Sequence, residues 1–165
     1  MIVPIFGSPG SGKTTLGNAI VRKFGYPFFE LSWIPEFRTI DGRVISYEEE
    51  EKIAVHALLK VAKTYCQYGH RIVLISDFRL NSFPQVLDSI GLASPVIKLI
   101  ASEEDTLRSR VLDSSRPSAY KDVDEALRIN KKIISQTFKN ELCIDVTECT
   151  LADEISTILE FISSN

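Results

Sequence analysis

The sequence predicts an α/β protein built around a parallel β-sheet, and three observations lead to this fold class. Short apolar runs recur along all 165 residues. They alternate with segments whose apolar residues repeat about every 3.6 positions, the period of an amphipathic helix. The runs are apolar throughout, which is typical of parallel strands covered by helices on both faces. Finally, four of the eight glycines lie within the first seventeen residues, where they indicate a special backbone shape.

The five apolar runs are the predicted strands of the sheet. They cover residues 2–6, 28–32, 72–76, 96–100 and 142–146. The first run contains Pro4, which lacks the N–H group that a central strand donates to its neighbour. We retain this strand because of the glycine-rich segment that follows it.

Helices are predicted between these strands. The first follows the early glycines, and its apolar face carries Leu16, Ala19, Ile20 and Phe24. A long helix begins at about Tyr47, where Ser46 and Glu49 match a capping box, and it ends at Gly69. Its apolar spacing predicts that the following side chains are buried: Ile53, Ala57, Leu58, Val61 and Tyr65.

Shorter helices are predicted in the second half of the chain from the same two signals, a polar cap and a helical apolar period. One begins at Ser82 and ends at Gly91, and a second covers residues 103–112 after Ser102. A third begins at Asp122 or Asp124, and the last begins at Leu151. The composition shows no break, repeat or linker along the chain. We therefore expect one domain over residues 1–165.

Composition and charge exclude several classes of protein. The net charge is −3, from 19 basic and 22 acidic residues, which gives no electrostatic footprint for duplex nucleic acid. No apolar stretch approaches the roughly 18–20 residues that span a bilayer, and no signal peptide is recognisable. The three cysteines show no C-x-x-C spacing. We expect a cytoplasmic protein with neither a nucleic-acid nor a membrane partner; the sequence does not predict an oligomeric state.

The residues Gly7-Ser8-Pro9-Gly10-Ser11-Gly12-Lys13-Thr14 fit the phosphate-loop pattern G-x-x-x-x-G-K-[ST] without a gap. The glycines allow successive N–H groups to turn inward as an anion nest, and the next helix adds the positive end of its dipole. Lys13 can reach the β- and γ-phosphates, and the Thr14 hydroxyl can hold Mg²⁺. The segment is therefore a predicted nucleotide-phosphate site, with ATP and Mg²⁺ as the expected cofactors.

This loop, followed by Thr15 and Leu16, resembles the opening of the small P-loop kinases, which include adenylate, shikimate and gluconate kinase. The resemblance extends along the chain in the order of the elements. It implies a three-layer fold with a five-stranded parallel sheet in the order 2-3-1-4-5 and a short lid. It also implies that Thr15 belongs to the nucleotide-binding residues.

A second motif lies at the end of the third predicted strand, where residues 72–77 form an apolar run that closes on Asp77. This is the shape of a Walker B element, whose carboxylate can hold Mg²⁺ through water or accept a proton from the attacking hydroxyl. Residues 76–79 resemble the Asp-x-Arg segment of phosphomevalonate kinase and of some deoxynucleotide monophosphate kinases, which implies an acceptor-binding role for Arg79. The alternative is an ordinary strand-terminal aspartate beside a solvent-facing arginine.

Arginines gather after the fourth strand, at positions 108, 110 and 116, the last followed by Pro117. The resemblance implies a lid over residues 110–121, in which Arg110 acts on the transferred phosphoryl group and Arg116 covers the adenine. A surface cluster of charge is the alternative. The loop at residues 145–150 would pack beside the adenine, or would be a plain turn with Thr150 as the helix cap.

The acceptor is expected to bind at residues 30–46. Arg38 resembles the shikimate kinase arginine that binds an anionic group, and Arg43 lies nearby. Glu30 ends the second strand and could serve as a general base, although Asp77 is the better candidate. Trp33 fits a core position as well as a substrate-binding one.

Together these motifs predict an ATP- and Mg²⁺-dependent phosphotransferase. The catalytic residues would be Lys13, Asp77 and Arg110, with Mg²⁺ held at Thr14 and Asp77. The first candidate acceptor is a nucleoside monophosphate or a similar phosphorylated metabolite, since Arg38 and Arg79 are basic. The alternative is a P-loop ATPase that couples hydrolysis to binding of a macromolecular partner.

Overall fold

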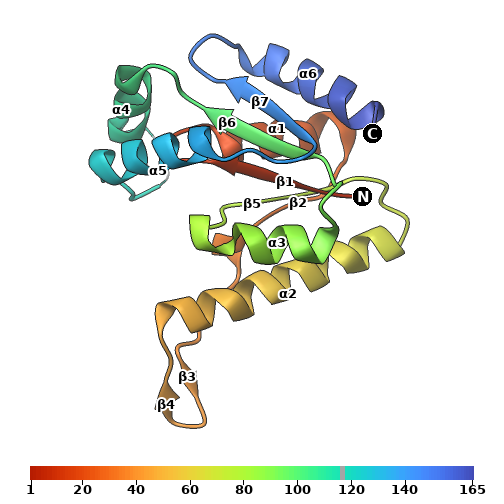
Figure 1. Cartoon of the computed structure of the whole chain (residues 1–165), viewed down its shortest axis with the longest axis vertical. Coiled ribbons are helices and arrows are strands. Elements are labelled where there is room, and N and C mark those ends of the chain that lie inside the picture. Colours follow the sequence, from red (N-terminus) through yellow and green to blue (C-terminus); the bar gives the residue numbers. More distant parts are fainter. Residues whose placement is uncertain (116–117) are drawn as a thin grey trace.

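The computed structural model describes residues 1–115 and 118–165, and its centre is a five-stranded parallel sheet (Figure 1). The strand order is β2-β5-β1-β6-β7. Counted among these five strands alone, the order is 2-3-1-4-5, so the expected topology is confirmed. Their bounds are Ile2–Gly7 for β1, Phe28–Glu30 for β2, Val73–Ser76 for β5, Val96–Ile100 for β6 and Glu141–Asp145 for β7.

Pro4 lies in the central strand without disrupting it. The Met1 carbonyl accepts a hydrogen bond from the Val73 N–H of β5. Bonding sides alternate along a strand, so the Pro4 nitrogen faces the other neighbour, β6. The register between β1 and β6 begins only at Ile5. The missing donor therefore falls just outside the paired part of that ladder.

Helices cover both faces of the sheet, with α1 and α6 on one side and α2 and α3 on the other (Figure 1). Their bounds are Lys13–Phe24 for α1, Tyr47–Gln67 for α2, Phe83–Ile90 for α3, Glu104–Leu112 for α4, Val123–Ser135 for α5 and Leu151–Ser163 for α6. Within the described ranges, none of these helices has the length and apolar character that crossing a membrane requires.

The hydrophobic core is divided by the sheet, as the alternation of β1 shows. Val3 and Ile5 pack into the cluster on the side of α1 and α6, whereas Ile2 and Phe6 face the other side. The ring of Phe6 contacts that of Phe83, with 3.8 Å between the ring centroids. Strands buried on both faces in this way explain why the runs are apolar throughout.

The buried face of α2 differs from the expectation. Leu58 is buried, but Ile53 and Tyr65 are exposed, and Ala57 and Val61 are only half-buried. The face that packs on the sheet carries Glu50, Glu51, Ala54, Val55, Leu58, Leu59 and Ala62. The prediction was wrong because this face begins with two glutamates, which an apolar pattern passes over.

The helix ends agree more closely with the sequence. Asp122 caps α5, and Thr150 with Asp153 forms a complete capping box at the start of α6. The Ser46 hydroxyl accepts from the Glu49 N–H, but the Glu49 carboxylate binds Arg43, so only half of that capping box forms. The α4 helix begins one residue later than expected, after Glu103.

One element was missed by the sequence analysis, an antiparallel hairpin of β3 (Thr39–Ile40) and β4 (Arg43–Val44). It projects beyond α2, away from the main sheet (Figure 1). Asp41 and Gly42 form its turn and both have positive φ, 49° and 78°. Asp-Gly is a preferred pair for a two-residue hairpin turn, so the signal was present in the sequence.

Candidate active site

The phosphate loop connects the end of β1 to the start of α1, where the pattern requires it. Gly10 and Gly12 adopt φ of 90° and 96°, values that a side chain would strain. A Cβ at Gly10 would also lie 2.8 Å from Cγ2 of Val111 in α4. The loop conformation therefore depends on glycine at these positions, and α4 packs directly against it.

Lys13 lies across this loop. Its Nζ donates to the carbonyl oxygens of Gly7 and Ser8, over 2.9 and 3.1 Å. The ammonium group is thus held close to the concave backbone that an anion would occupy. A phosphate in the loop would offer Lys13 charged oxygens, which form stronger hydrogen bonds than carbonyls do.

Glu30 lies beside Thr14, the position that the sequence analysis assigned to Asp77 as the carboxylate that holds Mg²⁺ with Thr14. The Thr14 hydroxyl donates to Glu30 Oε1 over 2.7 Å, and the Ser76 hydroxyl lies 3.4 Å from the same oxygen. Glu30 is only 7% exposed. Hydroxyl and carboxylate oxygens are hard donors of the kind that Mg²⁺ prefers, so the residues at this position fit that ion.

The position of Glu30 is fixed from behind by contact between α1 and β2. Gly17 lies one turn beyond Thr14, and a Cβ there would meet the ring of Phe28 at 2.5 Å or less. Glycine therefore lets the helix lie directly against the strand that carries Glu30. The contact keeps Thr14 and Glu30 within hydrogen-bond distance.

Asp77 follows directly after β5 and is exposed. Its φ of 73° places it in the left-handed region, which aspartate tolerates better than most residues. It lines the same cavity as Glu30 and Thr14. Two carboxylates from neighbouring strands thus lie at the carboxyl edge of the sheet, and the buried one bonds to the phosphate-loop threonine.

A cavity of about 800 Å³ extends along the loop. It is lined by Pro9, Gly10, Gly12, Lys13, Thr14, Thr15, Glu30, Ser32, Asp77, Arg110, Asp113, Ser118, Tyr120, Cys149, Leu151 and Glu154. The structure therefore brings Glu30, Asp77 and Arg110 together with the phosphate loop. Arg38 and Arg79 are outside this lining, and Arg116, the predicted adenine contact, lies outside the described residues.

Arg110 lies toward the end of the cavity formed by the β7–α6 loop. Its Nη2 donates to the Val146 carbonyl over 2.9 Å, so the side chain bridges from α4 to that loop. The loop itself is held by Asp145, which accepts from the N–H groups of Thr147 (2.9 Å) and Ser102 (3.2 Å). Burial opposes ionisation of Asp145, but these hydrogen bonds prevail and hold its pKa below the usual range.

Glu154, Tyr120 and Cys149 also line the cavity. Burial raises the pKa of Glu154, although the charge of Arg110 opposes the shift. Burial also raises the pKa of Tyr120, aided by Asp122 and Glu125. The Cys149 thiol has a raised pKa from burial and from neighbouring acids, first Glu154.

The predicted acceptor arginines meet on Tyr47. The guanidinium carbon of Arg38 lies 3.9 Å from the centre of the Tyr47 ring, and that of Arg79 lies 5.5 Å from it. Arg79 Nε is 3.4 Å from Oε2 of Glu51, a buried carboxylate of α2 that also accepts from the Ser82 hydroxyl over 2.5 Å. Both guanidinium groups thus lie within cation–π distance of the same ring.

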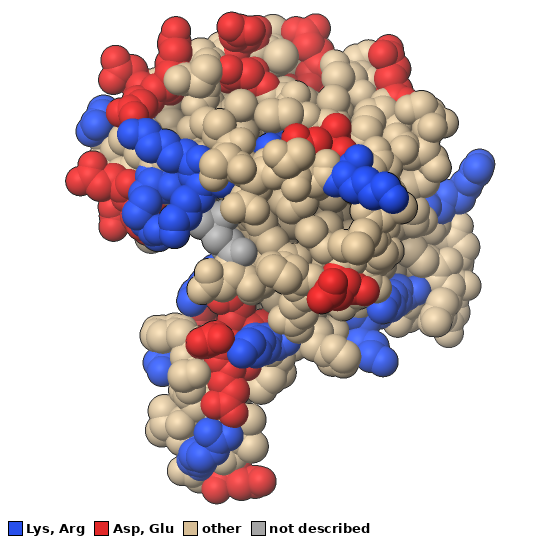
Figure 2. Space-filling view, in the orientation of Figure 1, with Lys and Arg blue, Asp and Glu red and all other residues tan. Residues whose placement is uncertain are grey.

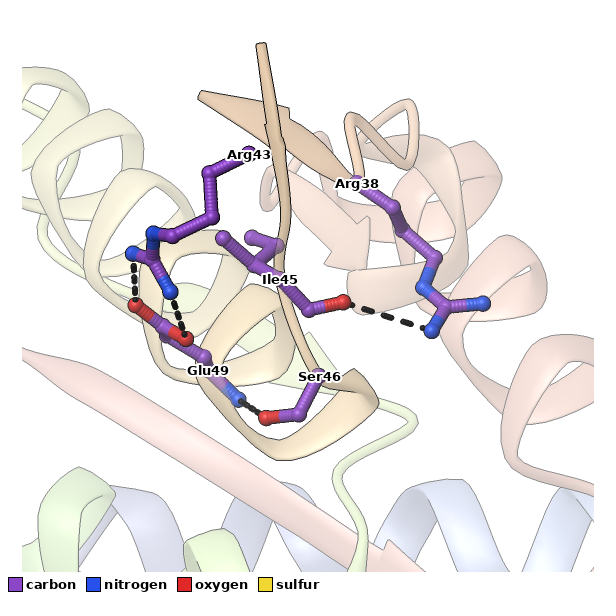
Figure 3. A network of polar contacts seen from close by, with 5 residues as sticks. All are labelled: Arg38, Arg43, Ile45, Ser46 and Glu49. Atoms are coloured by element: carbon purple, nitrogen blue, oxygen red, sulfur yellow. Dashed lines mark hydrogen bonds and ion pairs between the residues drawn. The ribbon is translucent and has the colours of Figure 1, made fainter. Parts of the chain in front are cut away.

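The hairpin is tied to the start of α2 by polar contacts (Figure 3). Arg43 forms a two-pronged ion pair with Glu49, with distances of 2.7 and 3.2 Å, and Arg38 Nη2 donates to the Ile45 carbonyl over 3.3 Å. Arg43 is therefore a brace of the hairpin. Arg38 Nε is buried and has no hydrogen-bond partner in the described part of the chain.

The acceptor region is open to solvent. Figure 2 shows a concave recess between the body of the protein and the projecting hairpin, with basic and acidic side chains near its rim. Trp33 is 53% exposed and contacts Phe28 and Phe29 edge-on, so it is not a core residue. Phe37 and Val44 are more exposed still, at 73% and 71%.

Sequence reasoning missed three residues of the site. Tyr47 was read only as the start of a helix, and Tyr120 and Glu154 carry no motif. The helical position of Glu154, on the same face as Ile155 and Ile158, could have indicated burial. In the described ranges, no group of three or more His, Cys, Asp or Glu residues could hold a metal ion, so a metal here would need phosphate oxygens as further ligands.

Comparison with known proteins agrees with this geometry. The family model described as "ATPase family associated with various cellular activities (AAA)" matches residues 3–79, from β1 past the phosphate loop to Arg79. No curated protein sequence matches the chain.

Solved structures match over nearly the whole chain. A sugar kinase from Janibacter sp. HTCC2649 is 17% identical, with a TM-score of 0.70, covering 98% of this chain and 94% of its own. A gluconokinase from Sinorhizobium meliloti 1021 is 17% identical, with a TM-score of 0.67, covering 98% and 91%. A shikimate kinase from Acinetobacter baumannii, in complex with shikimate, is 15% identical, with a TM-score of 0.60, covering 99% and 93%. The resemblance to small P-loop kinases is thus confirmed for the fold.

Proposed function

We propose that the protein is an ATP- and Mg²⁺-dependent kinase that transfers the γ-phosphoryl group to a small anionic acceptor. The observation that carries this proposal is the hydrogen bond between Thr14 and the buried Glu30, at the mouth of a complete phosphate loop. This contact supports the proposal because a carboxylate beside the phosphate-loop threonine would lie next to a nucleotide-bound cation.

The residues of the loop would bind and orient the nucleotide. The N–H groups of the loop and of the first turn of α1 hold the phosphates, and Lys13 turns from the Gly7 and Ser8 carbonyls toward them. Thr14, with Glu30 and Asp77, would hold Mg²⁺. A Mg²⁺ ion held by these residues would neutralise negative charge on the phosphates.

Glu30 and Asp77 would have different roles in the reaction. Glu30 is held in position by the hydrogen bond from Thr14 and by the close approach of α1 at Gly17. Its carboxylate would hold the cation directly or through a water molecule. Asp77 is exposed and lies just beyond the last residue of β5, so its carboxylate can reach an acceptor hydroxyl and take its proton. The lid at residues 110–121 would close over the phosphates.

Arg110 serves the nucleotide in this proposal. Its bond to Val146 places the guanidinium beside the β7–α6 loop, where a base extending from the phosphate loop would lie. This role differs from the one that the resemblance implied for Arg110, which was contact with the transferred phosphoryl group.

The acceptor would bind in the recess beside the hairpin. Arg38 and Arg79 present two positive charges on Tyr47, and Arg38 has an unsatisfied Nε donor in the described part of the chain. A phosphate or carboxylate is the group that such a pair binds best. A nucleoside monophosphate or a similar phosphorylated metabolite remains the first candidate.

The test is a coupled assay of ADP release with a panel of nucleoside monophosphates, sugar acids and phosphorylated metabolites. We expect at least one acceptor to raise ADP release well above the rate with water, and the Arg38→Ala variant to raise the KM for that acceptor. ADP release that stays at the rate with water across the panel would contradict the kinase proposal.

A second function has some support, an ATPase that couples hydrolysis to binding of a macromolecular partner. The match to the AAA model and the exposed Phe37 and Val44 of the hairpin region favour it. Hydrolysis stimulated by a protein or RNA fraction, with no phosphorylated small product, would select this function instead.

A further inference from the structure

The far end of the cavity contains an acidic side chain for which the proposed reaction has no use. Glu154 lies in the first turn of α6, lines the cavity and is 6% exposed. Its carboxylate makes no hydrogen bond or ion pair to any residue within 1–115 and 118–165. A carboxylate that lines a cavity without a hydrogen-bond partner calls for an explanation.

The structure of α6 does not supply that explanation. The cap of this helix is made by Thr150 and Asp153, whose side chains bond over 2.6 Å. The raised pKa of Glu154 shows that burial outweighs the favourable charge of Arg110. The folded chain therefore holds an acceptor group at a cost, which is typical of a group that serves a ligand.

A second unsatisfied group belongs to a residue that lines the same cavity. The Tyr120 hydroxyl is buried and has no hydrogen-bond partner among the described residues. With Glu154 it provides one acceptor and one donor, while Arg110 provides a planar cation. These are the contacts that the edge and the face of a heterocyclic base can satisfy.

The position of the phosphates fixes which part of a nucleotide reaches this end. The phosphate loop and the far end line one cavity of about 800 Å³. A nucleotide whose phosphates lie on the loop can therefore extend its base along this cavity to Glu154. Carboxylates accept hydrogen bonds, so the part of the base that meets Glu154 must carry an N–H group.

Resting on the proposed function, we propose that Glu154 reads the base of the nucleotide by accepting a hydrogen bond from an N–H group on the six-membered ring of a purine. Adenine offers its 6-amino group, and guanine offers N1–H and its 2-amino group. Unsubstituted purine offers neither. Glu154 is thus a specificity-determining residue.

The experiment compares dissociation constants by isothermal titration calorimetry. The ligands are ADP, GDP, purine riboside 5′-diphosphate and inorganic tripolyphosphate, which has no base. The variants are Glu154→Met, of similar length but without an acceptor, Glu154→Gln, which keeps one acceptor oxygen, and Glu160→Gln as a control. Glu160 is an exposed residue of the same helix.

We expect the wild type to bind ADP about tenfold more tightly than purine riboside diphosphate, the size of one hydrogen bond to a charged group. Glu154→Met should remove this preference and leave tripolyphosphate binding unchanged. Glu154→Gln should restore part of it, and Glu160→Gln should behave as the wild type. A preference for GDP that Glu154→Met removes would assign the same carboxylate to guanine and also support the proposal.

Two results would overturn the inference. In the first, wild-type protein binds ADP, GDP and purine riboside diphosphate equally. In the second, Glu154→Met weakens all three nucleotides by the same factor, which would mean that Glu154 acts only by orienting Arg110. Both leave the proposed function intact, whereas a wild type that binds neither nucleotides nor tripolyphosphate would overturn the proposed function itself.

Discussion

The Thr14 hydroxyl and the Glu30 carboxylate are joined by a 2.7 Å hydrogen bond across the junction of α1 and β2. The two residues are sixteen positions apart in the sequence. Their contact converts a phosphate-binding loop into a site with a fixed negative charge at its edge. A divalent cation bound here would contact both the Glu30 carboxylate and the Thr14 hydroxyl.

Replacing Glu30 by Gln tests this contact. The variant keeps the size of the side chain and an acceptor for Thr14, so its folding should be unchanged. We expect kcat to fall by roughly 10²-fold and the Mg²⁺ concentration for half-maximal activity to rise, because the carboxylate charge is lost. Steady-state kinetics over a Mg²⁺ series measures both; Glu36→Gln, an exposed neighbour, is the control. A normal Mg²⁺ dependence would remove Glu30 from the cation site.

Lys13→Ala should abolish most of the turnover while the protein stays folded. The ammonium group is needed on the phosphates, and its loss should cost about 10²–10³-fold in kcat. Circular dichroism and thermal unfolding check the fold, and Lys63→Ala on the exposed side of α2 checks for a general effect of losing a lysine. Unchanged turnover would exclude the phosphate loop from the mechanism.

Asp77→Asn separates the charge of this residue from its backbone role. Asparagine also adopts positive φ readily, so the φ of 73° should be retained and the free energy of unfolding should barely change. We expect kcat to fall, since an amide cannot take a proton from the acceptor. By contrast, Asp77→Ala should also be less stable, by about 1 kcal/mol. Equal activity of Asp77→Asn and wild type would show that Asp77 is structural.

Gly17→Ala should destabilise the protein by about 1–3 kcal/mol, because the new methyl group would overlap the Phe28 ring. Urea denaturation measures the change. The double variant Gly17→Ala with Phe28→Leu should recover part of the loss, since a smaller side chain leaves room for the methyl group. Additive losses in the double variant would show that the two residues do not conflict.

Asp145→Ala should lower stability in a pH-dependent way. The pKa of Asp145 is depressed in the folded protein, so its contribution is present above the unfolded value, near 3.8, and is lost as the pH falls through the folded value. We expect a loss of about 1–2 kcal/mol at pH 7, from two hydrogen bonds to a charged acceptor, that shrinks toward pH 3. Denaturation at both pH values measures the loss. Asp145→Asn does not titrate either, so its difference from wild type should also shrink toward pH 3, because it is the wild type that loses the carboxylate charge. A loss for Asp145→Ala that is the same at pH 7 and pH 3 would contradict this.

Much of the framework could be predicted because the signals are local. The order of strands and helices follows from runs of apolar residues, and the phosphate loop is a contiguous motif. The caps of α5 and α6 lie where Asp122 and Thr150 indicate them. Each of these features depends on residues a few positions apart, which a single sequence displays directly.

The parts that could not be predicted depend on contacts between distant segments. Glu51 is buried in α2, where it bonds to Ser82 of a later segment, and no helical period reveals such a partner. Similarly, Glu30 and Asp77 both end apolar strands, and only the fold shows which of them meets Thr14. The contact of Arg38 and Arg79 with the Tyr47 ring likewise combines the hairpin region, the segment after β5 and α2.

The β3–β4 hairpin forms a two-stranded sheet of its own and pairs with no strand of the five-stranded sheet. Its attachments to the body described above are side-chain contacts at the start of α2, such as that of Arg43 with Glu49. Insertions or replacements at its tip would therefore leave the distance between Thr14 and Glu30 unaltered. If the acceptor binds beside the hairpin as proposed, changes at its tip would alter acceptor binding without moving Thr14 and Glu30.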